Sequence, residues 1–476
     1  MNRFTITTSI AYTNAPPHIG FALELIQADV LARFHRQKGS QVFFLTGTDE
    51  HGMKIARSAE SASLPPQAFV DKVAGTFREL AKLLLVSNDD FIRTTDKERH
   101  WPSVRKMWEK LQESGDVYKK VYEGLYCVGC ETFVTEKDLV GELCPIHKKK
   151  PELIQEENYF FRLSRYGEKI AQALREGTMK IVPEHRTQEV LNFIEQGLED
   201  ISVSRSTNVL SWGIPVPEDS SQVFYVWLDA LTNYISALDY ANEGEAFQGF
   251  WPADVHCIGK DILRFHAIIW PAMLLSAGVA LPKSIFVHGF LTVDGQKMSK
   301  SIGNVVDPFE LIQKYGADAV RYFFLREIPP TEDGDFSQEK LEGRYNADLA
   351  GGLGNLLSRV LAMAEKQEVK AKKEIANQQT REWVEKTKQE VEHSLGDFRF
   401  HDALATIWEL ISHADRRIDK ERPWEGGKES ESAISDLLLV LREISDLLVP
   451  FLPQASESIK EQLSGDNRKP LFPRIL

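Results

Sequence analysis

The sequence predicts an α/β fold in which a doubly wound parallel sheet is split by an inserted domain and followed by an all-α bundle. Three observations support this prediction. Apolar runs typical of strands alternate with segments of helical periodicity in the first 116 residues and again from about residue 206. Between them, residues 117–205 carry shorter, mixed segments. Beyond about residue 340 the chain becomes helical in pattern and rich in Glu and Lys.

The first part of the predicted sheet begins close to the N-terminus. Residues 4–10 form a strand pattern, followed by a turn rich in Asn and Pro. Apolar residues then recur at helical spacing over 21–37, and Gly39 suits the end of that helix. The elements expected next are a strand at 41–45, a loop at 47–52 and helices at 67–86 and 97–114.

The alternation resumes after the insertion, with strands expected at 255–258 and 285–288 and a helix at 262–276 between them. This return of the same pattern indicates one sheet that is interrupted, not two separate sheets. The helices expected in the C-terminal bundle are 339–368, 379–395, 400–420 and 431–464.

Bulk properties limit the class of protein. A chain of 476 residues predicts two to four domains. With 42% hydrophobic and 27% charged residues, the composition is typical of a soluble globular protein. No apolar run is long enough to span a membrane, and the N-terminus lacks a signal-peptide pattern, so a cytoplasmic location is expected. The net charge of -13 disfavours a nucleic-acid partner unless a basic face is local.

Three of the four cysteines lie close together. Cys127 and Cys130 are followed by Cys144 and His147, a spacing typical of a tetrahedral zinc site with three thiolates and one imidazole. Because no coordination position stays open, the spacing predicts a structural zinc ion. The alternative is three unliganded thiols and a surface histidine. Cys257, within a predicted strand, is interpreted as a small core residue.

A first motif, Pro17-His18-Ile19-Gly20, lies where a strand passes into a helix. Helix N-termini at this edge of a parallel sheet attract phosphate. His18 can donate a hydrogen bond to a phosphate oxygen, and Gly20 lets an adenine ring approach the backbone. Taken alone, so short a match favours the alternative, a Pro-rich turn with an incidental histidine.

A second motif, Lys297-Met298-Ser299-Lys300-Ser301, follows a predicted hairpin at residues 293–296. Lysines on a mobile loop can neutralise a triphosphate as pyrophosphate leaves. A solvated basic loop is the alternative. In this order and at this separation, the two motifs predict ATP binding and activation of a small substrate.

The two motifs resemble the HIGH and KMSKS signatures of class I aminoacyl-tRNA synthetases, and further stretches resemble the methionyl family. The resemblance extends from residue 4 to the end of the chain and implies a split Rossmann-like catalytic domain. The stretches that carry it are Tyr12-Thr13-Asn14, 226–230, 259–262, 288–293 and 471–475. The implied parts are 1–116 and 206–290 (catalytic halves), 117–205 (insertion with zinc knuckle), 291–345 (KMSKS loop and junction) and 346–476 (anticodon-binding bundle).

This resemblance implies that methionine attacks ATP, bound with Mg²⁺, to give methionyl-adenylate, from which the amino acid passes to tRNA. The catalytic residues that it implies are His18, Lys297 and Lys300. The implied ATP-binding residues are His18, Gly20, Phe21, Gly259, Asp261, Lys297 and Lys300. Phe21 departs from the family pattern, which usually has a second histidine there, so we expect activity with altered ATP handling.

A methionine pocket is implied by position as well, with Asp49 holding the substrate amino group. Aromatic rings suit a thioether, and a tyrosine and a histidine can offer it a weak hydrogen bond. Taken alone, Trp227 and Tyr234 would be interpreted as ordinary core packing, which is more common for aromatic residues seven apart on a helix. The implied residues are Ile10, Tyr12, Asp49, Trp227, Ala230, Leu231, Tyr234, Ile262 and His266.

The helical part resembles the family's anticodon-binding bundle. Asn355 and Arg359 lie four residues apart on one helix face and can pair with or stack on bases, and Trp424 can stack on an unpaired base. The implied partners are methionine, ATP and the tRNA with the methionine anticodon. A monomer is expected, without a membrane partner.

Two alternatives stay open. The first is a class I synthetase for another amino acid, although an insertion of about ninety residues leaves little room for the editing domain of the isoleucyl, valyl and leucyl enzymes. The cysteinyl enzyme needs a first-strand cysteine, and residues 7–10 contain none. The second is a non-catalytic tRNA-binding paralogue, favoured by Phe21 but opposed by Asp49, Trp227 and the two lysines.

Overall fold

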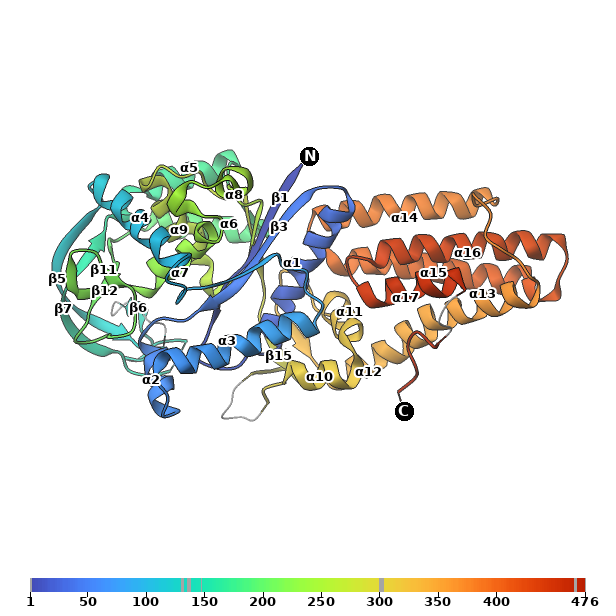
Figure 1. Cartoon of the computed structure of the whole chain (residues 1–476), viewed down its shortest axis with the longest axis horizontal. Helices are drawn as coiled ribbons and strands as arrows, with labels where there is room; N and C mark the ends of the chain where they lie inside the picture. The colour runs from blue at the N-terminus through green and yellow to red at the C-terminus, as the bar shows by residue number, and fades with distance from the viewer. Residues whose placement is uncertain are drawn as a thin grey trace. The chain divides into compact units, whose positions relative to one another are not determined.

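The structure, a computed structural model, describes residues 2–129, 132–134, 138–146, 148–298, 304–465 and 469–475. The chain divides into two compact units (Figure 1). The first unit contains the chain up to Pro17, then Gly39–Glu79 and Asn88–Val287. The second contains His18–Lys38, Leu80–Ser87 and the chain from His288 onward. None of the described helices is long and apolar enough to cross a membrane.

A parallel sheet of seven strands forms the centre of the first unit, as predicted. Its order is β2-β3-β1-β13-β14-β8, with β4 beside β3. β1 lies in the middle, so the chain leaves it toward β3 on one side and reaches β13 on the other much later. Ligands of such sheets bind where the strand order reverses. The strands are β1 (Arg3–Thr8), β2 (Ala11–Tyr12), β3 (Gln41–Asp49), β4 (Asp90–Arg93), β8 (Lys180–Val182), β13 (Val255–Gly259) and β14 (Ser284–His288).

Helices of this unit pack with the strands of the sheet in one large apolar core. At the junction with the insertion, the ring of Trp108 lies edge-on to Tyr159 and Phe224, at 5.1 and 5.2 Å between centroids. The helices are α2 (Met53–Ser61), α3 (Pro66–Leu83), α4 (His100–Glu113), α5 (Gly167–Glu176), α6 (Glu184–Glu195), α7 (Val226–Ser236), α8 (Glu245–Phe250) and α9 (Trp270–Ser276).

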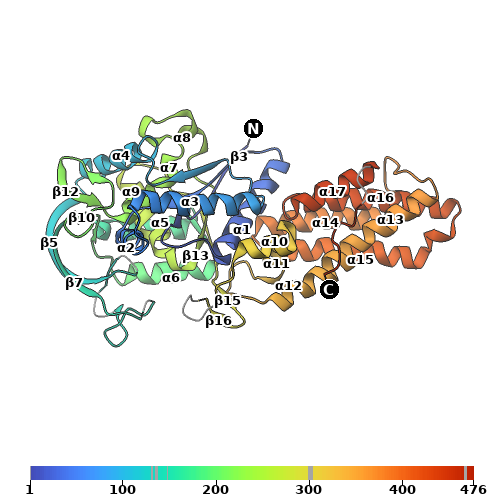
Figure 2. The same ribbon diagram turned by 60° about the horizontal axis from the view of Figure 1, so that its bottom comes forward.

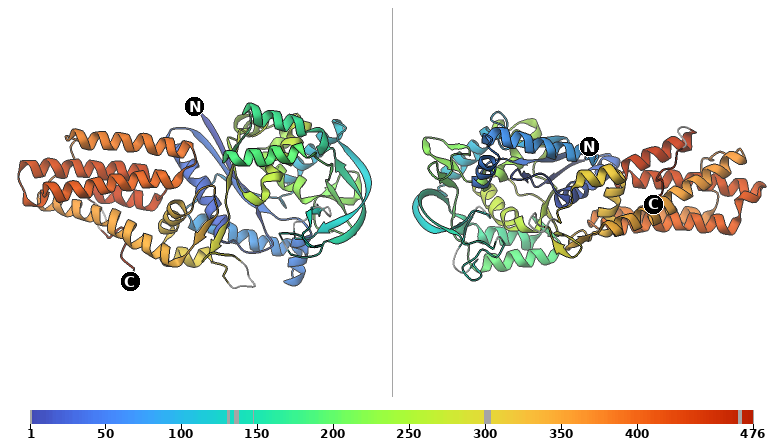
Figure 3. Two further views of the ribbon diagram at one scale, coloured as in Figure 1. Left: turned by 180° about the vertical axis from the view of Figure 1, so that it is seen from behind. Right: turned by 90° about the horizontal axis from the view of Figure 1, so that it is seen from below.

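The insertion forms antiparallel sheets. Its long strands β5 and β7 run side by side as a curved ribbon (Figures 2 and 3). The segment also returns to the parallel sheet, because β8 pairs with β14. The strands of these antiparallel sheets are β5 (Val117–Cys127), β6 (Thr132–Val134), β7 (Glu152–Phe161), β9 (Ile201–Ser202) and β10 (Ser204–Ser206), joined by β11 (Pro215–Val216) and β12 (Asp219–Phe224) from beyond residue 205.

The second unit is mainly helical, and its helices from α13 onward form a bundle (Figure 2). Its elements are α1 (Ile19–Gln37), β15 (Leu291–Val293), β16 (Gln296–Lys297), α10 (Pro308–Tyr315), α11 (Ala317–Glu327), β17 (Gly334–Phe336), α12 (Gln338–Arg344), a π-helix (Tyr345–Gly354), α13 (Asn355–Lys366), α14 (Gln378–Gly396), α15 (Phe400–Glu421), α16 (Lys428–Leu448) and α17 (Pro453–Ser464).

A buried ion pair explains why α1 belongs with this unit. Arg321 of α11 contacts the Asp29 carboxylate of α1 at 2.7 Å, and both side chains are fully buried. Arg321 also donates to the carbonyls of Phe451 and Pro450, at 2.7 and 2.8 Å. Because these bonds satisfy the guanidinium on several sides, its desolvation is compensated.

The structure corrects several predicted boundaries. The strand predicted at 4–10 ends at Thr8, and the one predicted at 41–45 continues to Asp49. The helix predicted at 262–276 contains a π-helical turn before α9, because Pro271 has no N–H for the preceding turn. The predicted helix 431–464 is two helices, α16 and α17, since prolines at 450 and 453 interrupt the backbone ladder.

The hairpin predicted before the second motif is confirmed. β15 and β16 pair antiparallel, with Val293 opposite Gln296. Asp294 and Gly295 both have positive φ, 50° and 73°. Two consecutive left-handed residues are what a two-residue hairpin of type I′ requires.

One buried carboxylate makes the stability of the second unit pH-dependent. Asp318 Oδ2 accepts from Ala455 N at 2.6 Å, and burial raises the pKa of Asp318 to about 6, from 3.8. A raised carboxyl pKa means that the folded state binds the proton more tightly than the unfolded state. Its stabilising contribution is therefore complete below pH 3.8 and is lost as pH rises through about 6.

We therefore expect Asp318→Asn to melt at a higher temperature than the wild type at about pH 8, because the amide keeps an acceptor without a buried charge. The difference should shrink toward about pH 4. Circular dichroism melts across this pH range measure it, with Glu457→Gln, an exposed carboxylate in α17, as the control. A lower melting temperature for Asp318→Asn at pH 8 would contradict this account.

Candidate functional site

The first part of the candidate site lies at the carboxyl ends of the central strands in the first unit. Tyr12 of β2 is opposite Asp49, the last residue of β3. The Thr13 amide and hydroxyl both donate to the Asp49 carbonyl, at 3.0 Å. The backbone of Asp49 is thus fixed, and its side chain is 7% exposed. Ile10, half-buried, follows β1 at the same edge.

The second part is a wall of apolar and aromatic residues on α7 and in the segment after β13. The wall residues on α7 recur at helical spacing: Trp227, Ala230, Leu231 and Tyr234. The Tyr234 hydroxyl lies 2.7 Å from His266 Nε2. Trp227 stacks on Phe265, with 3.5 Å between centroids and 12° between planes. The buried Trp227 Nε1 has no hydrogen-bond partner among the described residues.

Phe265 is absent from the residues predicted by sequence. Its position next to His266 was the available signal, but only the fold shows that its ring covers Trp227. A stacked pair of this kind presents a flat apolar face, which suits a thioether side chain.

The positions of the protons on Tyr234 and His266 differ from what the sequence analysis expected of these two side chains. His266 Nδ1 lies 3.0 Å from the Ile262 carbonyl, which can only accept, so the proton is on Nδ1. Burial lowers the pKa of His266 to about 4, so the ring is neutral near pH 7. Nε2 therefore accepts the Tyr234 proton. The expected weak hydrogen bond from these groups to sulfur is not offered here, because both protons already have acceptors.

A second histidine that the sequence did not single out lies behind Tyr234. His256 Nδ1 is 2.7 Å from Thr7 Oγ1, and Trp270 Nε1 donates to His256 Nε2 at 3.3 Å. Its ring lies 4.3 Å from the Tyr234 ring, between centroids. Burial lowers the pKa of His256 well below its usual value, so this imidazole is a neutral packing partner of Tyr234.

The first motif is in the second unit, at the start of α1. His18 Nδ1 accepts from Gly20 N at 3.0 Å and so caps the helix. This bond leaves the proton of the neutral ring on Nε2. A Cβ at position 20 would lie 2.8 Å from His18 Cε1, so Gly20 makes room for the imidazole. Phe21 is only 9% exposed, so a buried apolar ring stands where the family usually has a second histidine.

The structure describes some, but not all, of the other residues that are predicted to bind the nucleotide. Lys297 ends β16, opposite Thr292, whereas Lys300 lies outside the described residues, together with Ser299 and Ser301. In the first unit, Gly259 is buried at the end of β13. Asp261 follows in a short 3-10 helix, Lys260–Ile262, and is exposed.

The predicted anticodon residues lie on the helical bundle. Asn355 is exposed at the start of α13, and Arg359 is one turn further on. Arg359 contacts Asp415 and Asp419 of α15 at 3.1 and 2.7 Å. Trp424 is 43% exposed in the turn after α15. These side chains are accessible to a ligand of the bundle.

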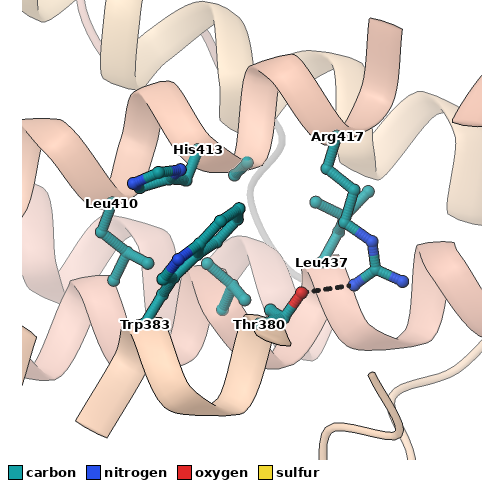
Figure 4. Close-up of a pocket in the computed structure, with 8 residues that line it drawn as sticks. Thr380, Trp383, Leu410, His413, Arg417 and Leu437 are labelled. Atoms are coloured by element: carbon teal, nitrogen blue, oxygen red, sulfur yellow. Dashed lines mark hydrogen bonds between the residues drawn. The ribbon is translucent and has the colours of Figure 1, made fainter. Parts of the chain in front are cut away.

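A pocket between α14, α15 and α16 belongs to the packing of the bundle (Figure 4). Trp383 of α14 lies flat against His413 of α15, with 3.7 Å between centroids. Arg417 donates to Thr380 Oγ1 and to Asp436 Oδ2, both at 3.1 Å. The aromatic stack and these bonds join the three helices.

Two of the four predicted zinc ligands can be placed. Cys127 ends β5 and Cys144 lies just before a turn, at 3% and 1% exposure. Cys130 and His147 lie outside the described residues. Within the part of the chain that the structure describes, no group of three or more His, Cys, Asp or Glu residues is placed to hold a metal.

Comparison with known proteins identifies the class first. The family model described as "tRNA synthetases class I (M)" matches residues 4–148 and 134–361. Together with the parallel sheet, the helical C-terminal part and the two motifs, this match makes the chain a class I tRNA synthetase.

The relatives identify the family within that class. The chain is 47% identical to methionine–tRNA ligase of Caldanaerobacter subterraneus subsp. tengcongensis, over 97% of this chain and 74% of that protein. It is 41% identical to that of Brucella melitensis biotype 1, over 100% and 94% of the two chains. The solved structure of Mycobacterium tuberculosis methionyl-tRNA synthetase in complex with methionyl-adenylate is 37% identical, with a TM-score of 0.94 over the whole of both chains. The chain belongs to the methionyl-tRNA synthetase family.

Proposed function

We propose that this chain uses ATP to ligate L-methionine to its tRNA through a methionyl-adenylate, with the residues described above. Relatives that are 41–47% identical over nearly the whole chain are methionine–tRNA ligases. The observation in the structure that carries the proposal is the pairing of two features in one unit. A carboxylate, Asp49, ends a central strand, and α7 carries apolar and aromatic side chains at helical spacing.

Activation of methionine needs both ends of the amino acid to be held. Asp49 binds the ammonium group, while Trp227, Tyr234 and His266 receive the thioether chain. The other proposed pocket residues are Ile10, Tyr12, Ala230, Leu231 and Ile262. A methionine carboxylate oxygen then forms a bond to the α-phosphorus of ATP, and the bond from that phosphorus to pyrophosphate breaks. Catalysis is mainly positioning and charge stabilisation, because no covalent enzyme intermediate forms.

ATP, which this family uses with Mg²⁺, carries the charge that the two motifs neutralise. The His18 Nε2–H and the lysines of the second motif stabilise the phosphates as pyrophosphate leaves. The proposed nucleotide-binding residues are His18, Gly20, Phe21, Gly259, Asp261, Lys297 and Lys300. In the second step a ribose hydroxyl at the tRNA terminus attacks the methionyl carbonyl, and AMP leaves. We propose that Asn355, Arg359 and Trp424 read the anticodon.

ATP–pyrophosphate exchange with each of the standard amino acids tests this function. We expect exchange that depends on methionine. No exchange with methionine in folded protein would contradict the proposal. Exchange with a different amino acid would favour another class I specificity, and tRNA binding without any exchange would favour a non-catalytic paralogue.

A zinc ion held by Cys127, Cys130, Cys144 and His147 is proposed on the ligand spacing. The two placed members fit such a role in chemistry, since both are thiols shielded from water. Cys144→Ser is expected to lose about one zinc ion per chain, because a hydroxyl is a poor zinc ligand. Metal analysis by mass spectrometry measures it.

The control for this prediction is Cys257→Ser. Cys257 is fully buried in β13, so its replacement disturbs the core but is expected to leave the zinc content unchanged. Equal zinc contents in Cys144→Ser and the wild type would contradict the site.

The five-part division, the monomeric state and the cytoplasmic location stay predictions. They agree with a tRNA-charging enzyme, whose substrates are dissolved in the cytoplasm. Sedimentation at several concentrations measures the oligomeric state.

A further inference from the structure

Three buried polar residues near the methionine pocket have no role in the function proposed so far. They come from separate segments of the first unit: His51 after β3, His100 at the start of α4, and Asp229 in α7. His51 Nδ1 is 2.7 Å from Asp229 Oδ2, and His100 Nε2 is 2.7 Å from Asp229 Oδ1. Their side chains are 3%, 0% and 1% exposed.

The charge on this cluster follows from its contacts. Burial works to raise the pKa of Asp229, but the two imidazoles outweigh it and lower the pKa below its usual value. Asp229 is therefore ionised and can only accept hydrogen bonds, so each imidazole donates an N–H to it. Its place in the first turn of α7 also favours a negative charge.

His51 connects this carboxylate to the subsite for the substrate amino group. It lies two residues beyond Asp49, in a segment that is fixed by other contacts. Arg93 binds both Glu50 carboxylate oxygens, at 2.7 and 2.8 Å, and Trp212 Nε1 donates to the Glu50 carbonyl at 2.6 Å. The segment from Asp49 to His51 is therefore stiff, so the bond from His51 to Asp229 holds the end of β3 against α7.

Asp229 connects the same cluster to the subsite for the substrate side chain. It lies on α7 two residues after Trp227 and next to Ala230. His100, by contrast, connects α7 to α4 and also contacts Ser236 Oγ at 2.8 Å. α4 carries none of the residues proposed to bind substrate. The two imidazoles thus lie at the same distance from one carboxylate. His51, however, belongs to the segment that carries Asp49, whereas His100 belongs to α4.

We propose that His51 and Asp229 are positioning residues that set the Asp49 carboxylate at the correct distance from the α7 wall, whereas His100 only stabilises the packing of α4. Methionine has its ammonium group and its thioether at opposite ends, so the two subsites must lie at the correct distance from each other to bind it. A misplacement of about 1 Å between such groups costs up to about a hundredfold in rate. This proposal about His51 and Asp229 rests on the proposed function, because both concern the same methionine-binding residues.

The two histidines offer a matched test. His51→Ala and His100→Ala each remove one bond of 2.7 Å to the same carboxylate. We expect His51→Ala to raise the KM for methionine by about tenfold or more, with the KM for ATP changed by less than about twofold. His100→Ala should lower the melting temperature but change the methionine KM by less than about twofold. Pyrophosphate exchange and thermal unfolding measure these quantities.

Conservative variants separate positioning from general stability. An Asn amide reaches the place of a histidine Nδ1, and a Gln amide the place of Nε2. His51→Asn should therefore restore a methionine KM close to that of the wild type, and His51→Gln should not. If an alanine variant does not fold, this Asn and Gln pair decides the question instead.

Equal shifts in methionine KM from His51→Ala and His100→Ala would overturn the inference, as would equal rescue by Asn and Gln at position 51. In both cases the wild type stays active, so the proposed function survives. A folded wild type without methionine-dependent exchange would overturn the proposed function and the inference together.

Discussion

Asp49→Asn is expected to lower kcat/KM for methionine by about 10²–10³-fold. Removing one partner of a buried charge pair costs about 2–5 kcal/mol, and about 1.4 kcal/mol is a factor of ten. Asp49 is 7% exposed, so water does little to replace the lost charge. The amide has the same shape, and the bonds from Thr13 go to the Asp49 carbonyl, so the strand end is preserved. Pyrophosphate exchange at varied methionine concentration measures the effect.

Asp116→Asn is the matched control for this change. Asp116 is a buried carboxylate of the same unit, with partners on Tyr166, Ser276 and Arg165. Its replacement is expected to lower stability and leave kcat/KM for methionine within about threefold. If Asp49→Asn behaves like Asp116→Asn, then Asp49 does not bind the ammonium group.

His18→Asn is expected to slow adenylate formation by about a hundredfold. Loss of one donor to a developing charge in a transition state typically costs this much. Asn is among the preferred N-cap residues, so its side-chain oxygen can still accept from Gly20 N and keep α1 capped. The Nε2–H of the imidazole is lost, and the amide does not extend as far. Exchange rates at saturating methionine and varied ATP measure the loss.

The same substitution at His35, in the last turn of α1, is the control. Because His35 is not among the residues proposed to bind substrate, His35→Asn should keep the wild-type exchange rate within about twofold. A His18→Asn variant with a normal rate and a normal melting temperature would show that the first motif acts only as a helix cap.

The sequence predicts elements well where the pattern is local. The alternation of strands and helices around β1, α1 and β13 shows directly in the spacing of apolar residues. Two boundaries that the sequence analysis misplaced could also have been recognised from the positions of prolines. Prolines at 450 and 453 signal the break between α16 and α17, and Pro271 signals the irregular turn before α9.

The end of β3 shows why other boundaries are not local. Gly47 looks like a loop residue, yet it pairs with Ile92 of β4. A Cβ at position 47 would lie 2.2 Å from the Ile92 carbonyl oxygen, so glycine is there for the close approach of a second strand. No property of residues 41–49 alone reveals that neighbour.

The sequence by itself determined the α/β class and the helical C-terminal part, and it predicted both nucleotide motifs and, through the family resemblance, the residues proposed for a methionine pocket. These features depend on periodicity and on short stretches of chain. Only the tertiary structure decided which side chains meet and where their protons lie. It brought Phe265 onto Trp227 and joined His51 to Asp229, 178 residues further along the chain. It also made His266 a neutral acceptor, because burial and an adjacent carbonyl, neither visible in the sequence, fix the protonation of a histidine.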